Sequence, residues 1–198
     1  MKIGLIGSRF FGAEMFELLR ERGHEIHVVA PDAEDRLAQA AQAAGAPLVL
    51  HTGRRRIKAE DLPDGLDVIV AAHSHAMIPL DVREKARVAA LGYHPSLLPR
   101  WRGIAAVEWT IKERDPIAGG SVYHLTDEMD AGGIAAQDWC FVLPDDDAGS
   151  LWRRELAPMG LRLLAQVVDE IAETGKCAAA EQDERLITLA PMIKKDVA

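Results

Sequence analysis

The chain has 198 residues, of which 48% are hydrophobic, and a formal net charge of −8. This length favours one catalytic domain, expected over residues 1–176, followed by a polar tail over residues 177–198. The acidic balance argues against nucleic acid as a partner, because a phosphate-binding surface needs clustered lysines and arginines. No apolar run approaches the ~20 residues of a membrane span, and the first residues lack a secretory segment. We therefore expect a cytoplasmic protein with no membrane partner.

Short strands alternate with amphipathic helices through the first half of the chain. We expect strands at residues 3–6, 25–30, 48–50 and 66–71, and helices at 11–22 and 35–44. Apart from Asp67, the run 66–71 is apolar, which is typical of a central parallel strand covered on both faces. This alternation predicts an α/β protein with a Rossmann-like three-layer sandwich and a mostly parallel sheet.

The second half has a different pattern. A strand is expected over residues 88–93, and two further strands over 120–125 and 133–143 are close enough in sequence to form an antiparallel edge. A long helix is expected to begin near Pro158, because proline suits the first helical turn, and to stop at Gly175.

A glycine pattern after the first strand resembles a dinucleotide-binding fingerprint but is broken. Gly7 and Gly12 occupy the first and third glycine positions, whereas Arg9 occupies the second. That position must let the backbone approach a pyrophosphate closely, which a side chain prevents. The pattern therefore predicts a βα turn at the start of the sheet and argues against nicotinamide binding.

His94 and Asp130 are the candidate catalytic residues. His94 follows an apparent strand, at the sheet edge where ligands bind in α/β proteins, and Pro95 and Pro99 stiffen the next turn. Asp130 lies in a glycine-rich loop that can close over a cleft. An oriented imidazole and a carboxylate on two loops suit proton transfer in acyl-type chemistry. For a lone histidine, the alternative is a ring satisfied by a backbone carbonyl.

These two segments, in this order and separation, resemble the folate-dependent formyltransferases. The matching positions after the histidine are 95–99, 102–103, 109–111, 119–122, 130, 132, 134, 137 and 143–146, and residues 1–12 and 70–79 match more loosely. The resemblance is closest to the amino-terminal hydrolase domain of 10-formyltetrahydrofolate dehydrogenase, and methionyl-tRNA formyltransferase is also similar. It covers nearly the whole chain.

The resemblance implies transfer of a formyl group from 10-formyltetrahydrofolate to a small amine through a tetrahedral intermediate. It implies that His94 stabilises the oxyanion and that Asp130 assists proton transfer. It also implies that the loop of Ser8 and Arg9 lines an acceptor pocket. The folate-binding residues that it implies are Ala76, Met77, Ile78, Ser96, Leu97, Leu98 and Pro99.

One position departs from the family pattern. The family's catalytic trio is Asn-x-His with a distant Asp, and its asparagine position falls on Gly92, which has no side-chain donor. This leaves open a hydrolase that releases formate and tetrahydrofolate, with water in place of the amine. A non-catalytic folate-binding module is a further alternative, against which the presence of both His94 and Asp130 argues. The oligomeric state is not set by the sequence.

Metal binding is not expected. His73 and His75 have a spacing that suggests a metal, but no further matched ligands accompany them. Cys140 and Cys177 lie outside any disulfide or zinc spacing. The basic run Arg54 to Arg56 is expected to be a solvated loop, with an anion contact as the alternative.

Overall fold

The computed structural model describes residues 1–193 and has an α/β fold with one mixed sheet of seven strands. The strand order is β3-β2-β1-β4-β5-β6-β7; the pairs from β3 to β5 are parallel, and the last pair, β6 and β7, is antiparallel. The expected mostly parallel sheet with an antiparallel edge is confirmed. The chain divides into two units, residues 1–93 with 164–177 and residues 94–163 with 178 onward.

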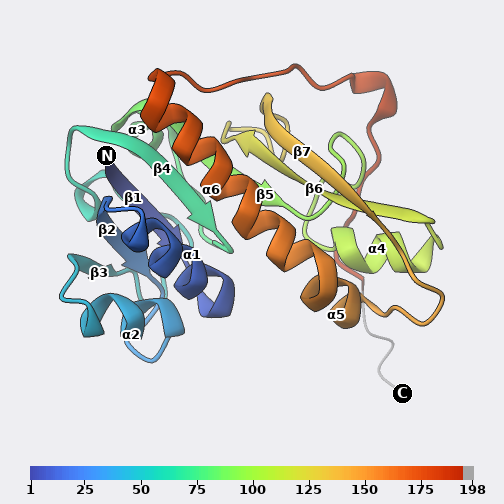
Figure 1. Cartoon of the computed structure of the whole chain (residues 1–198), viewed down its shortest axis with the longest axis horizontal. Helices are drawn as coiled ribbons and strands as arrows, with labels where there is room; N and C mark the ends of the chain where they lie inside the picture. The colour runs from blue at the N-terminus through green and yellow to red at the C-terminus, as the bar shows by residue number, and fades with distance from the viewer. Residues whose placement is uncertain (194–198) are drawn as a thin grey trace. The chain divides into compact units, whose positions relative to one another are not determined.

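The first unit contains the parallel strands (Figure 1). They are β1 (Lys2–Gly7), β2 (Glu25–Ala30), β3 (Leu48–Leu50), β4 (Leu66–Ala72) and β5 (Ala86–His94), the last of which ends on the first residue of the second unit. The two middle strands, β1 and β4, are almost fully buried. This burial explains why their sequences are apolar apart from Lys2 and Asp67 instead of alternating.

Helices α1 (Arg9–Glu21) and α2 (Arg36–Ala43) follow the first two strands, as expected. Phe11, Met15, Phe16 and Leu19 form the buried face of α1. This helix begins two residues earlier than the hydrophobic period predicts, directly after the extended Ser8. Three short elements had no sequence signal: η1 (Ala59–Asp61), α3 (Leu80–Arg83) and η3 (Glu184–Leu186).

The second unit contains the hairpin of β6 (Ile117–His124) and β7 (Ile134–Phe141), preceded by helix α4 (Ala106–Lys112). The helix expected from Pro158 begins earlier. It starts as α5 (Ala148–Leu151), continues through the π-helical turn η2 (Trp152–Leu156) and becomes α6 (Ala157–Thr174), which ends before Gly175 as expected. Asp147 caps the earlier start by accepting the Ser150 N–H at 2.6 Å. Pro158 therefore lies inside the helical stretch, just after the wider π-helical turn.

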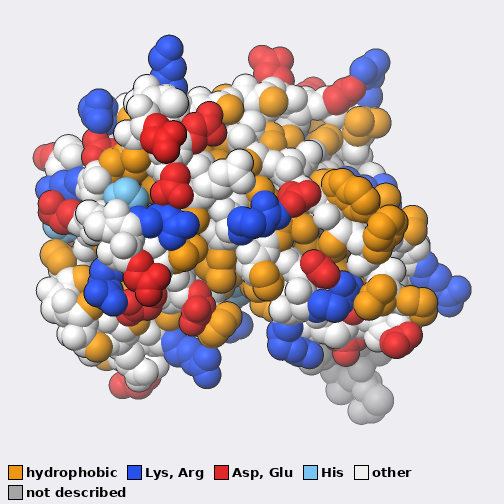
Figure 2. Space-filling model, viewed as in Figure 1, with side chains coloured by type: hydrophobic (Ala, Val, Ile, Leu, Met, Phe, Trp, Pro, Cys, Tyr) orange, Lys and Arg blue, Asp and Glu red, His pale blue; other side chains and the backbone are white. Residues whose placement is uncertain are grey.

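The outer end of the β6–β7 hairpin carries exposed hydrophobic side chains, which gather on one face in Figure 2. Trp139 and Phe141 are 52% and 62% exposed and meet edge to face at 5.1 Å. They are two residues apart on β7, so they share one face of the last strand of the sheet. Among the described residues, no helix is long and apolar enough to cross a membrane.

Candidate active site

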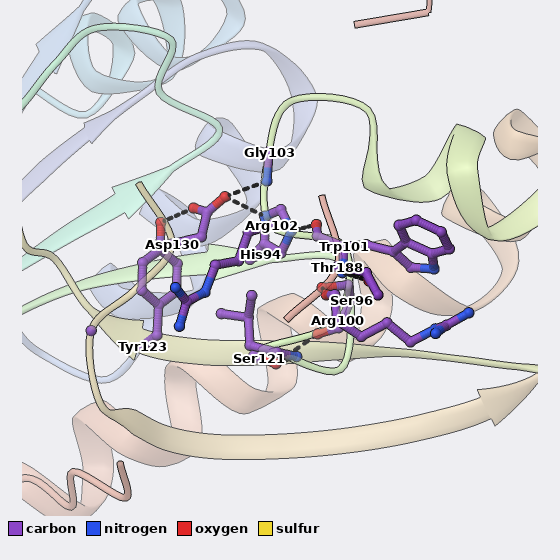
Figure 3. Close-up of polar contacts among 12 residues, drawn as sticks. His94, Ser96, Arg100, Trp101, Arg102, Gly103, Ser121, Tyr123, Asp130 and Thr188 are labelled. Carbon is purple, nitrogen blue, oxygen red and sulfur yellow. Dashed lines mark hydrogen bonds and ion pairs between the residues drawn. The ribbon is translucent and has the colours of Figure 1, made fainter. Parts of the chain in front are cut away.

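His94 and Asp130 come together in the second unit (Figure 3). His94 is the last residue of β5, and Asp130 lies in the loop between β6 and β7. The imidazole Nδ1 lies 3.6 Å from the carboxylate Oδ2, and the two residues are only 6% and 9% exposed. A buried imidazole beside a buried carboxylate is an arrangement suited to proton transfer.

A backbone carbonyl fixes the protonation of the imidazole. His94 Nε2 lies 2.7 Å from the carbonyl oxygen of Trp101, which can only accept a hydrogen bond, so Nε2 carries the proton. For a lone histidine, the alternative is a ring that is simply hydrogen-bonded to a backbone carbonyl. In His94 this holds for Nε2 only. The other, Nδ1, faces Asp130 and is the atom left for chemistry.

Two donors hydrogen-bond the Asp130 carboxylate. The Gly103 N–H donates to Oδ2 at 2.8 Å, and the Tyr123 hydroxyl donates to Oδ1 at 2.7 Å. Burial, followed by the charge of Asp130, raises the pKa of Tyr123 well above its ordinary value. The phenol therefore remains a donor at any working pH. Sequence reasoning missed Tyr123, although Ser121 and Tyr123 form a polar period-two pair on a buried strand.

The loop that carries Asp130 has a demanding backbone. Asp130 is in the left-handed region with φ 55°, which few residues other than glycine adopt. At Gly132 a Cβ would lie 1.8 Å from the His124 carbonyl oxygen, so no larger residue fits without displacing the loop. The Gln182 amide donates to the carbonyl oxygens of Asp130 and Gly132 at 2.8 and 2.7 Å. Gln182 is a second residue that the sequence gave no signal for.

The turn after His94 is held by the hairpin strands. The Ser121 hydroxyl accepts the Leu98 N–H at 3.1 Å and donates to the Ser96 carbonyl at 2.6 Å. The Gln137 amide donates to the Leu98 carbonyl at 2.9 Å. The Leu98–Pro99 peptide bond is cis. Four of the expected folate contacts, residues 96–99, thus lie in one stiff turn beside His94.

Two stacked indoles lie at the end of this turn. The rings of Trp101 and Trp109 are 5.7 Å apart, and the guanidinium of Arg100 lies over the first ring at 4.6 Å. Ala106 and Ala190 complete the buried cluster. The carbonyl that orients His94 therefore belongs to a residue fixed by packing.

The other expected folate contacts belong to the first unit, so their part in the same site stays a prediction. The Met77 N–H and carbonyl are both bonded to the segment 55–57, at 2.8 and 2.9 Å. The Met77 side chain is 49% exposed, Ala76 is half-buried and Ile78 is buried. Met77 therefore offers a ligand an apolar side chain and no free backbone group.

The turn between β1 and α1 packs closely against the end of the neighbouring strand β4. A Cβ at Gly7 would lie 2.3 Å from the Ala72 carbonyl oxygen, so this glycine permits close approach of β1 and β4. The Ser8 hydroxyl donates to the His73 carbonyl at 2.8 Å, and the Arg9 N–H donates to Asp35. These contacts fit the expectation of a βα turn at the carboxyl ends of neighbouring parallel strands.

The basic run is not uniformly solvated. Arg54 makes a two-pronged ion pair with the buried carboxylate of Asp61, at 2.8 and 3.0 Å, whereas Arg55 and Arg56 are exposed. The rings of His73 and His75 meet edge to face at 4.7 Å. Within residues 1–193, no group of three or more His, Cys, Asp or Glu could hold a metal ion.

Comparison with known proteins gives relatives over the whole chain. The cytosolic 10-formyltetrahydrofolate dehydrogenase of Homo sapiens is 36% identical over 211 residues, which cover 100% of this chain but only 23% of that protein. The methionyl-tRNA formyltransferase of Lactobacillus delbrueckii subsp. bulgaricus is 29% identical, with 96% of this chain and 64% of that protein covered. The chain thus spans about a quarter of the first relative's length.

A solved structure shares the fold. HypX from Aquifex aeolicus, crystallised with tetrahydrofolic acid, matches with a TM-score of 0.71 and 20% identity, over 98% of this chain and 30% of that one. The profile of the formyl transferase family matches residues 11–168, which include both His94 and Asp130. The chain therefore belongs to the formyl transferase family.

Proposed function

We propose that the chain transfers a formyl group from 10-formyltetrahydrofolate to a small amine. The observation that carries this proposal is the buried pair of His94 and Asp130, with Nδ1 3.6 Å from Oδ2. Family membership and a fold relative crystallised with tetrahydrofolic acid support a reduced folate as the donor. A small amine is the proposed acceptor, since a net charge of −8 is unsuited to binding tRNA.

The chemistry follows from the orientation of the His94 ring, whose Nε2 is held by the Trp101 carbonyl and whose Nδ1 faces Asp130. The amine nitrogen attacks the formyl carbon, and the carbonyl oxygen gains negative charge. A proton on Nδ1 of the imidazolium hydrogen-bonds this oxyanion, while Nε2 stays bonded to Trp101. The Asp130 carboxylate balances the imidazolium charge and assists removal of the proton from the amine. The bond from carbon to folate N10 then breaks, and N10 takes up that proton, which leaves tetrahydrofolate and the N-formyl product.

Binding of the folate is assigned to two segments. The stiff turn of Ser96, Leu97, Leu98 and Pro99 would line one part of the pocket, since its backbone groups are held by Ser121 and Gln137. Residues 76–78 would contact the flat pterin through the exposed Met77 side chain. Flat heterocycles are commonly held by an apolar wall with few polar groups.

Hydrolysis is the second candidate, and Gly92 favours it. Without the asparagine amide, one oxyanion donor is missing, and the space left by its side chain can admit a water molecule, which would act as the nucleophile. The products would then be formate and tetrahydrofolate. The similarity to 10-formyltetrahydrofolate dehydrogenase, from the first residue of this chain onward, points the same way.

One experiment separates these activities. Purified protein is incubated with 10-formyltetrahydrofolate alone and with a panel of small amines, and tetrahydrofolate and formate are measured. Turnover only with an amine identifies the transferase, and formate release without one identifies the hydrolase. Folate binding with neither product would refute both and leave a binding module. Gly92→Asn restores the family donor and is expected to raise the ratio of transfer to hydrolysis. An unchanged ratio would contradict the assignment of that position.

A further inference from the structure

The segment after Cys177 contacts both loops that carry the candidate catalytic pair. We name residues 178–191 the strap. Its first part pairs with the Asp130 loop: Ala180 exchanges two backbone hydrogen bonds with Ile134, at 2.7 and 2.8 Å, and the Ala178 carbonyl lies 2.8 Å from His124 Nε2. The strap therefore binds both ends of the loop between β6 and β7.

The last part of the strap pairs with the turn after His94. The Thr188 hydroxyl accepts the Trp101 N–H at 2.8 Å, and the Thr188 carbonyl accepts the Arg102 N–H at 2.9 Å. Ala190 donates its N–H to the Arg102 carbonyl at 2.7 Å. These contacts fix the peptide whose carbonyl holds His94 Nε2.

Gln182 links the two loops through one amide group. Its Nε2 donates to the carbonyls of Asp130 and Gly132, and its Oε1 accepts from Arg102 Nε and Nη2 at 3.1 and 2.8 Å. A guanidinium only donates and a carbonyl only accepts, so the amide orientation is forced. Arg102 belongs to the turn after His94 and is 8% exposed, and Gln182 is half-buried, so the link is partly shielded from solvent.

We propose that Gln182 is a positioning residue for formyl transfer, which holds the left-handed Asp130 backbone at the distance from His94 that the reaction needs. This inference rests on the proposed function. The amide touches no reacting atom. It acts by tying the carbonyl of Asp130 to a buried side chain of the opposite loop. Displacement by about 1 Å commonly costs two orders of magnitude in rate.

Two substitutions test the link. Gln182→Glu keeps an acceptor for Arg102 but cannot donate to the two carbonyls. Gln182→Leu removes both functions. For each we expect kcat to fall about 10- to 100-fold with KM for 10-formyltetrahydrofolate unchanged within about twofold. Glu181→Gln, the reverse exchange on the exposed neighbouring residue, is the matched control and should leave both constants unchanged.

A second readout does not depend on turnover. The Gly103 N–H donates to Asp130 Oδ2, so its amide proton resonance reports where the carboxylate lies. In both Gln182 variants this resonance should move in the direction that Asp130→Ala produces. An unmoved resonance together with unchanged kcat, or an effect on KM alone, would overturn the proposal. If Gln182→Leu does not fold, Gln182→Glu decides. If the native protein shows no activity on 10-formyltetrahydrofolate, the proposed function fails, while the Gly103 signal still tests the link.

Discussion

Replacing Asp130 by asparagine removes a charge with little change in shape. The asparagine oxygen can accept the Gly103 N–H, and its amide can donate to the Tyr123 oxygen, so both present partners keep a hydrogen bond. The variant should therefore fold, with a thermal midpoint close to that of the native protein. What it loses is the negative charge facing His94.

The size of the effect follows from the geometry. At 3.6 Å and an effective dielectric constant of about 20, an imidazolium and a carboxylate attract each other by about 4.6 kcal/mol. Each 1.36 kcal/mol of transition-state stabilisation is a factor of ten in rate. Asp130→Asn should therefore lower kcat by about 2,500-fold, measured as tetrahydrofolate release at saturating 10-formyltetrahydrofolate.

Tyr123→Phe is the control for this experiment. It removes one hydrogen bond to the carboxylate but leaves the charge, and an about tenfold loss is expected. If Asp130→Asn retained more than a tenth of the native kcat, the charge of Asp130 would play no part in the reaction, and the proton-transfer role would be refuted.

Two further predictions concern the stability of the folded protein. Burial alone would raise the pKa of Asp61, but hydrogen bonds from Arg54 and the Lys58 N–H hold it below its ordinary value of 3.8. The ion pair therefore contributes its full stabilisation at pH values above 3.8. This contribution is lost as the pH falls through the lower pKa that Asp61 has in the folded protein. Asp61→Asn should lower the free energy of unfolding by about 2 kcal/mol at neutral pH. In urea titrations the difference should narrow below about pH 4, and a constant difference would contradict it. Gly132→Ala should cost about 2 kcal/mol and most of the activity, because the new Cβ meets the His124 carbonyl oxygen. A fully active, equally stable variant would show that the loop adapts freely.

The fold was predictable where the hydrophobic period is strong. The strands at residues 25–30 and 48–50 have the expected bounds, and the proline after His94 agrees with β5 ending there. Helix α4 has seven residues, which is too short to set a period. The start of α5 was missed because Pro158 gave a stronger signal than the Asp147 cap.

The site was predictable only in part. His94 and Asp130 came from two motifs whose order and separation resemble a family, not from periodicity. Tyr123 and Gln182 contribute through contacts with residues 7 and 52 positions away in sequence, which no local pattern encodes. Likewise, three consecutive arginines do not reveal that Arg54 alone pairs with Asp61. Residues 194–198 of the expected tail lie outside the described part of the chain.

The stacked indoles of Trp101 and Trp109 give the site an optical signal of its own. Two rings 5.7 Å apart and inclined by 26° couple their electronic transitions, and such fixed aromatic packing is seen in near-ultraviolet circular dichroism. The same Trp101 supplies the carbonyl that holds His94. A variant that has lost catalysis but keeps this spectrum has an intact turn, so its defect lies in the chemistry and not in the scaffold.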